Sequence, residues 1–136
     1  MKTKTILVLI SVAALWAARP AQAHHAFAAE YDVSKPVTLV GTLAKIEWVN
    51  PHGWIKMNVK QPDGTTKLWT IETTNPNQLV TRGLKKTAFV DGMSLTVKGY
   101  QGIKDPALAN GRTLIFADGR SVYIGSIGGP EDGAEK

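Results

Sequence analysis

The sequence contains no cysteine. This absence excludes disulfide bonds, zinc–thiolate sites, iron–sulfur clusters and thiol nucleophiles. Without covalent cross-links, the folded chain must draw its stability from an apolar core and from the hydrogen bonds of its sheet. Methionine is scarce, with three residues in the chain, so a methionine-rich Cu(I) site is not expected. Met57 is predicted to lie in the core and Met93 at the start of a strand.

Several enzyme signatures are missing as well. The chain has no Gly-x-Ser-x-Gly elbow, no phosphate-binding loop and no dinucleotide fingerprint, so we assign no catalytic residue. The formal net charge is +5, but three of the 16 basic residues and none of the 11 acidic ones lie in the first 23 positions. The remaining chain has 13 basic and 11 acidic residues, a net charge of +2. Such a mixed surface does not predict a nucleic-acid partner.

The chain has one long apolar run, near its N-terminus. A positively charged start over residues 1–4 precedes an apolar stretch over residues 6–18, and Ala21 and Ala23 supply the small side chains that a signal peptidase reads. The stretch is short for a membrane span, which needs about 20 apolar residues. We therefore expect a cleavable signal peptide over residues 1–23, no stable membrane anchor after cleavage and a periplasmic mature protein.

The rest of the chain is dominated by strand-forming residues. Strands are predicted over residues 37–49, 54–60, 65–72, 93–100, 112–116 and 121–124. Gly41 lies inside the first of them and predicts a bulge or a sharp bend. Turns are predicted over residues 50–53 and 62–64, and a loop over residues 101–110.

One short helix is predicted over residues 76–82. Asn75 has the side chain of an N-cap, the first helical residue is a proline, and Gly83 is suited to the position just after the helix. Leu79 and Val80 are expected to face the core.

The order of these elements predicts an all-β fold with one short helix. Three strands, a helix, one strand and a final hairpin match a small OB-like antiparallel barrel of five to six strands, in which the helix caps the barrel. A small β-sandwich is the alternative. We expect an N-terminal arm over residues 24–36, one barrel domain over residues 37–127 and a flexible tail over residues 128–136.

Five short stretches give the chain a family resemblance. They are residues 23–32 (AHHAFAAEYD), 35–39 (KPVTL), 41–42 (GT), 47–48 (EW) and 50–52 (NPH). From His24 to about Ser126 the chain resembles a family of exported bacterial proteins classed as a domain of unknown function. The resemblance implies export and a small β-rich domain, and it implies no particular activity, substrate or cofactor.

The chain has three histidines, His24, His25 and His52. Cleavage after residue 23 would free the α-amine of His24, which would then chelate a metal through its amine and its ring nitrogen. The imidazole of His52, in a predicted turn, would complete a T-shaped nitrogen site, and His25 could replace it or join it. Such a site suits Cu(II) and resembles the histidine brace of exported copper proteins, while Zn(II) is the alternative metal.

Simpler interpretations of the same residues stay open. The N-terminal histidines can be a flexible start, and the histidine of the turn can serve only to hydrogen-bond the backbone. Tyr31, Glu30 and Asp32 are weaker candidates for oxygen donors near a metal. Glu47 and Glu72 are either a carboxylate pair on neighbouring strands or, as is more common for strand residues, solvated or ion-paired with lysines such as Lys45 or Lys56.

Trp54 is the best candidate for an aromatic side chain that faces a ligand. It lies on the polar face of its predicted strand, opposite the apolar residues. This feature supports a second hypothesis, a non-metal OB-type module that binds a small ligand, an oligosaccharide or a protein partner. The first hypothesis is the one drawn from the histidines, an exported metal-binding or carrier protein with copper as the metal. A copper redox enzyme is a third hypothesis.

Overall fold

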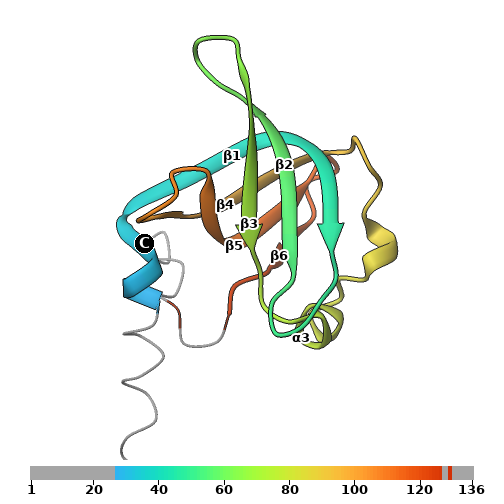
Figure 1. Cartoon of the computed structure of the whole chain (residues 1–136). Coiled ribbons are helices and arrows are strands. Elements are labelled where there is room, and N and C mark those ends of the chain that lie inside the picture. The colour runs from blue at the N-terminus through green and yellow to red at the C-terminus, as the bar shows by residue number, and fades with distance from the viewer. Residues whose placement is uncertain (1–26, 127–128, 130–136) are drawn as a thin grey trace, which may run out of the picture.

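The computed structural model describes residues 27–126 and Gly129 (Figure 1). Its elements, in chain order, are β1 (Tyr31–Glu47), β2 (Trp54–Lys60), β3 (Thr66–Glu72), helix α3 (Pro76–Thr81), the 3-10 helix η1 (Lys86–Ala88), β4 (Ser94–Gly102), β5 (Leu108–Phe116) and β6 (Ser121–Tyr123). Residues 27–30, just before β1, are helical. The predicted strand-dominated class is confirmed. The predicted signal peptide, His24, His25 and the predicted tail apart from Gly129 lie outside the described residues.

The described strands form one sheet that closes on itself. Its order is β3-β2-β1-β4-β5-β6 with antiparallel neighbours, and β3 also pairs in parallel with β5. This pairing, which we call the seam, joins Thr70, Ile71 and Glu72 to Leu108, Ala109 and Asn110. The resulting ring agrees with the predicted closed sheet, and the sandwich alternative fits the arrangement as well. Figure 1 shows the β2–β3 hairpin rising beyond the rest of the sheet.

The loop predicted over residues 101–110 is wrong at both ends. β4 continues to Gly102, and β5 already begins at Leu108. The first three residues of β5 are held by the parallel seam with β3, and such a pairing between distant segments leaves no local pattern in the sequence.

β1 begins six residues earlier than predicted, at Tyr31 and not at residue 37. The start of the strand pairs with the end of β4, and the register shifts between Asp32 and Pro36. The shift accommodates Pro36, because proline has no N–H to donate to a neighbouring strand. The strand therefore runs through the proline that was expected to end the N-terminal arm.

Gly41 allows β1 and β2 to approach each other closely. A Cβ at this position would lie 2.2 Å from the backbone oxygen of Asn58. The register irregularity between β1 and β2 lies slightly further along, between Leu43 and Lys45. The bend predicted at the glycine is thus a close approach of two backbones, with the bulge two residues later.

Alternate residues of the strands point into the ring and form the apolar core. Its fully buried members include Ile55, Met57, Ile71, Val97 and Leu114. The predicted core position of Met57 is confirmed. Among the described residues, no helix combines the length and the hydropathy needed to cross a membrane.

Helix α3 has the predicted caps. The side chain of Asn75 accepts a hydrogen bond of 3.0 Å from the backbone N–H of Gln78, and Gly83 adopts a φ of 85°. Leu79 is buried as predicted, but Val80 is 48% exposed, so its predicted core position is wrong. Neighbouring residues of a helix point about 100° apart, and this six-residue helix presents one narrow face to the core.

Candidate functional site

A buried carboxylate at the end of β3 joins two distant parts of the chain. The side chain of Glu72 is 6% exposed. Its Oε1 contacts Nδ1 of His52, and its Oε2 accepts a hydrogen bond from the hydroxyl of Tyr31. Since burying a carboxylate without partners is unfavourable, these two contacts are what allow it to lie there. One side chain thus connects the β1–β2 turn with the start of β1.

Backbone hydrogen bonds hold the β1–β2 turn beside Glu72. The N–H of Gly53 donates to the oxygen of Thr74 at 3.1 Å, and the N–H of Thr73 donates to the oxygen of Gly53 at 2.9 Å. A Cβ on Gly53 would lie 2.7 Å from the hydroxyl oxygen of Thr73, so the close approach favours glycine. The turn and the end of β3 therefore lie at the same end of the sheet, next to α3 (Figure 1), and His52 is carried there with them.

The imidazole of His52 is oriented by one nitrogen and open at the other. Its side chain is 42% exposed, Nδ1 contacts Glu72, and Nε2 has no hydrogen-bond partner among the described residues. A carboxylate on Nδ1 fixes the ring and places the free lone pair on Nε2. Histidines that ligate metals are commonly held in this way, so the ring suits a ligand that binds through Nε2.

Tyr31 is a buried phenol that acts as a donor. Its residue is 3% exposed, and burial, with a smaller contribution from the charge of Glu30, raises the pKa of its hydroxyl well above 10. The hydroxyl therefore stays protonated at neutral pH and donates to Glu72.

The segment that leads into β1 packs beside this phenol. The ring of Phe27 lies 5.3 Å from that of Tyr31 and 6.1 Å from that of Tyr100, measured between centroids. The N–H of Ile103 donates to the backbone oxygen of Glu30 at 2.9 Å, which ties the segment to the end of β4. The described chain that follows His24 and His25 is thus docked on the domain.

A row of cross-strand neighbours continues the site across the sheet. Trp54 lies opposite Glu47 of β1 and Glu72 of β3, and Glu72 lies beside Asn110 of β5. Residues paired in this way lie on the same face of a sheet. Trp54 is half-buried, and the side-chain oxygen of Asn110, which is buried, has no hydrogen-bond partner among the described residues. The row places an aromatic ring next to the carboxylate that holds His52.

Glu47 does not pair with Glu72. Its Oε1 lies 3.1 Å from Nζ of Lys45 and 3.1 Å from Nζ of Lys56, and these lysines lower the pKa of its carboxyl. The prediction of lysine partners holds for Glu47, whereas Glu72 has the histidine and the tyrosine as its partners.

The other predicted oxygen donors differ in their surroundings. Asp32 accepts hydrogen bonds from the N–H of Ser34 at 2.9 Å and from its hydroxyl at 2.6 Å, and these bonds, together with Lys35, lower the pKa of the carboxyl. Its oxygens are therefore engaged within its own strand. Glu30 is exposed.

The structure places part of the predicted site together. His52 and Trp54 flank Gly53 and both lie next to Glu72, whereas His24 and His25 lie outside the described residues. Within those residues, no cluster of three or more histidine, cysteine, aspartate or glutamate side chains could hold a metal ion.

The role of Glu72 as the anchor of His52 was missed by sequence reasoning. The contacting residues are 20 and 41 positions apart in the chain, so no spacing motif links them. The one available signal is the hairpin register around the turn at residues 62–64, which sets Glu72 opposite Trp54.

Comparison with known proteins places the chain in a family. No curated protein and no solved structure matches it. A family model described as a family of unknown function, DUF6152, matches residues 12–109, a range that contains all three histidines, Trp54 and Glu72. The match covers most of the chain, and the chain therefore belongs to the DUF6152 family.

Proposed function

We propose that the protein is exported to the periplasm and binds a metal ion there, with copper as the preferred metal, as a carrier or sequestering module. The proposed ligands are the amine and ring of His24 and Nε2 of His52, with His25 as an auxiliary ligand. The observation that carries this proposal is the contact of His52 Nδ1 with the buried Glu72, which orients the ring and leaves Nε2 open. Export rests on the composition of residues 1–23.

The packing of the segment from Phe27 to Pro36 on the domain supports a role for His24. Phe27 packs on Tyr31, and Tyr31 shares the carboxylate of Glu72 with His52. Three residues of extended chain span at most about 11 Å, so the amine of His24 can reach only positions around Phe27. The first described residue of the arm, Phe27, therefore packs on the part of the domain that also holds Glu72 and its partner His52.

The available donors fit Cu(II) better than Cu(I). The proposed ligands are nitrogens, which Cu(II) accepts in a planar arrangement, and Zn(II) is the alternative with the same ligands. Neither methionine of the described domain offers its sulfur as a soft ligand. Met57 is fully buried in the core, and the sulfur of Met93 accepts the N–H of Val90. When bound, the ion would be a cargo or a Lewis acid held by nitrogen.

Copper titration of the untagged protein, processed after residue 23, tests this proposal. We expect His52→Ala to weaken Cu(II) binding at least about tenfold, and one residue added before His24 to do the same, because each change removes a proposed ligand. His25→Ala, at the auxiliary ligand, is expected to have a smaller effect than either change. Unchanged affinity in His52→Ala would remove His52 from the site, and unchanged affinity in the extended protein would remove the amine.

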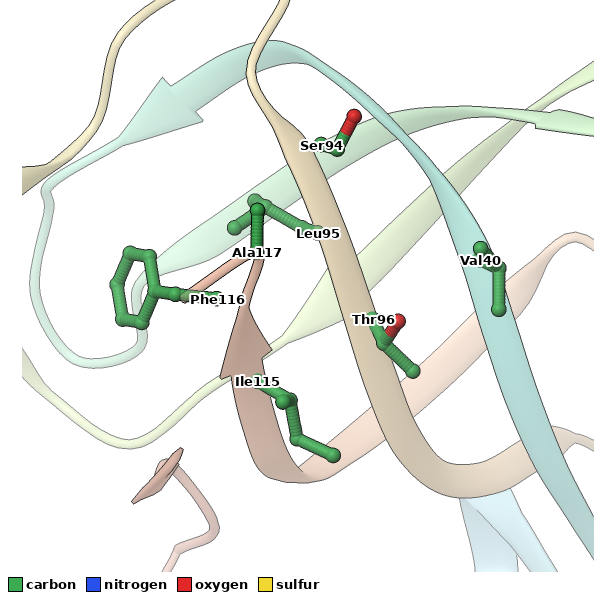
Figure 2. A pocket seen from close by; sticks show the side chains of 7 residues that line it. All are labelled: Val40, Ser94, Leu95, Thr96, Ile115, Phe116 and Ala117. Carbon is green, nitrogen blue, oxygen red and sulfur yellow. The ribbon is translucent and has the colours of Figure 1, made fainter. Parts of the chain in front are cut away.

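A groove on the outside of the sheet favours the second candidate function, a non-metal binding module. The groove has a volume of about 680 Å³, and its lining includes Val40, Thr42, Asn58, Lys60, Thr66 and Ser94. A smaller hollow of about 70 Å³ adjoins it and shares Val40 and Ser94 (Figure 2). Hydroxyl, amide and ammonium groups beside an exposed valine suit a small polar ligand or an oligosaccharide.

Chemical-shift mapping of the metal-free protein separates the two functions. Addition of an oligosaccharide series should shift the amide signals of Val40, Asn58 and Ser94 if the groove is a binding site. Unchanged amide signals with every oligosaccharide would contradict the proposal that the groove binds a sugar.

A further inference from the structure

We propose that Glu72 and Tyr31 are positioning residues of the His52 site, and that Glu72 couples the docked arm to the turn that carries His52. Here the docked arm is the segment from Phe27 to Pro36. The inference deepens the proposed function and rests on it for its metal measurement, whereas its structural measurement needs no metal.

The coupling follows from the way in which one carboxylate is divided between two partners. Oε1 of Glu72 serves His52 of the turn, and Oε2 serves Tyr31 of the arm. The carboxylate of Glu72 is buried in both contacts, so replacing either partner by water would cost free energy. Hydrogen bonds to a carboxylate are also stronger than those between neutral groups. Loss of one partner should therefore shift the carboxylate and loosen the other.

Hydrogen bonds hold the backbone of Glu72 and of the residues after it in place. Loss of His52 or Tyr31 as a partner should therefore affect the other partner through movement of the Glu72 side chain. Directly after it, the N–H of Thr73 donates to Gly53 of the turn, and the N–H of Thr74 donates to the oxygen of Ile124 at 2.7 Å. On its other side, Glu72 is part of the parallel seam with β5. A rearrangement is therefore expected in the carboxylate, the arm and the imidazole, with the sheet unchanged.

The chain offers a matched control for each positioning residue. Tyr100 also contacts the ring of Phe27, but its hydroxyl has no hydrogen-bond partner among the described residues. Glu47 is also a cross-strand neighbour of Trp54, but its carboxylate is held by lysines. Tyr100→Phe and Glu47→Gln thus make the same chemical changes as Tyr31→Phe and Glu72→Gln without touching the coupled contacts.

The metal-free test uses nuclear magnetic resonance of the processed, untagged protein. The ring nitrogens of His52 report its tautomer, and the amide of Ile103, which donates to Glu30 of the arm, reports docking of the arm through hydrogen exchange. In Tyr31→Phe we expect the Ile103 amide to exchange about tenfold faster, the effect of losing one buried hydrogen bond to a carboxylate. In Glu72→Gln we expect both faster exchange and a mixture of His52 tautomers. Both control variants should match the wild type.

The metal test uses the same four variants. Cu(II) affinity should fall about 10- to 100-fold in Glu72→Gln, and to a smaller extent in Tyr31→Phe, although neither residue is a ligand. The nitrogen hyperfine pattern in electron paramagnetic resonance should persist in both, because the ligands remain.

The outcomes separate the two proposals. A wild-type protein whose Cu(II) binding does not depend on His52 overturns the proposed function, and the metal-free measurements still decide the coupling. Wild-type tautomer and wild-type Ile103 exchange in the variants overturn the coupling, whatever the metal does. If Glu72→Gln does not fold, Tyr31→Phe, which keeps the aromatic ring in place, decides alone.

Discussion

At the scale of single residues, the buried phenol of Tyr31 links stability to alkaline pH. Its pKa is raised in the folded state, so its contribution to stability is complete below the unfolded value near 10. Above that pH the unfolded phenol loses its proton while the folded one keeps it. Stability then falls by about 1.4 kcal/mol per pH unit until the folded phenol also ionises.

Urea unfolding at pH 9, 10 and 11 checks this first prediction. The free energy of unfolding of the wild type should fall more steeply than that of Tyr31→Phe, by about 1 kcal/mol at pH 11. Tyr100→Phe should follow the wild type, because Tyr100 keeps a partly exposed ring and its hydroxyl has no partner in the described part of the chain. Parallel pH profiles for the wild type and Tyr31→Phe would contradict the role of the burial.

Gly41 carries the second prediction at this scale. Because a Cβ would meet the backbone oxygen of Asn58 at 2.2 Å, Gly41→Ala must push β1 and β2 apart. We expect a loss of about 1–3 kcal/mol in the free energy of unfolding, typical of overpacking. Val40→Ala, at a neighbouring position that is 64% exposed, should change it by less than about 0.5 kcal/mol. Equal effects of the two substitutions in chemical denaturation would show that the close approach is not limiting.

At the scale of elements, the cap of α3 is a local contribution that can be isolated. Asn75→Ala removes the acceptor of the Gln78 N–H and should destabilise the protein by about 1 kcal/mol. Asn77→Ala changes the same residue type on the exposed side of the helix and should be nearly neutral. Thermal unfolding of both variants measures the difference. A neutral Asn75→Ala would mean that packing of Leu79, and not the cap, holds the helix.

Elements with a local signal could be predicted from the sequence, and elements held by distant partners could not. β2 and α3 have alternation or caps within a few residues, and their predicted positions agree with the structure to within one residue. The start of β1 and the start of β5 depend on pairing with segments far away in the chain, so their predicted bounds are wrong. Pro36 added to the error, since its place at a register shift is not visible in the sequence.

The residues of the candidate site also fall into two groups, those that the sequence indicates and those that only the fold brings in. The sequence indicates His52 and Trp54 through their chemistry and through their places in a turn and a strand, which are local properties. Their common neighbour Glu72, and the hydroxyl of Tyr31 on it, depend on how the closed sheet brings three separate segments together. A carboxylate within a strand gives no sign in the sequence that it will be buried.

At the scale of the whole molecule, the seam between β3 and β5 determines how the core is sealed. Ile71 is fully buried and pairs there with Ala109. Ile71→Ala should cost about 2–5 kcal/mol, because it leaves a cavity where the ring closes. Leu68→Ala, on the same strand at a position that is 49% exposed, is expected to cost much less. Chemical denaturation of both variants makes the comparison, and similar losses would show that the seam does not seal the core.

The seam joins segments that are distant in the chain, so we expect it to form late in folding. β1, β2 and β3 follow one another and can pair through short turns, but Glu72 and Asn110, which pair in the seam, are 38 positions apart in the chain. Contacts that close such a long loop cost more entropy and slow folding. If the ring closes after the rate-limiting step, substitutions at the seam speed unfolding and leave the refolding rate almost unchanged. The three residue pairs of the seam would then determine the lifetime of the folded protein more than its rate of folding.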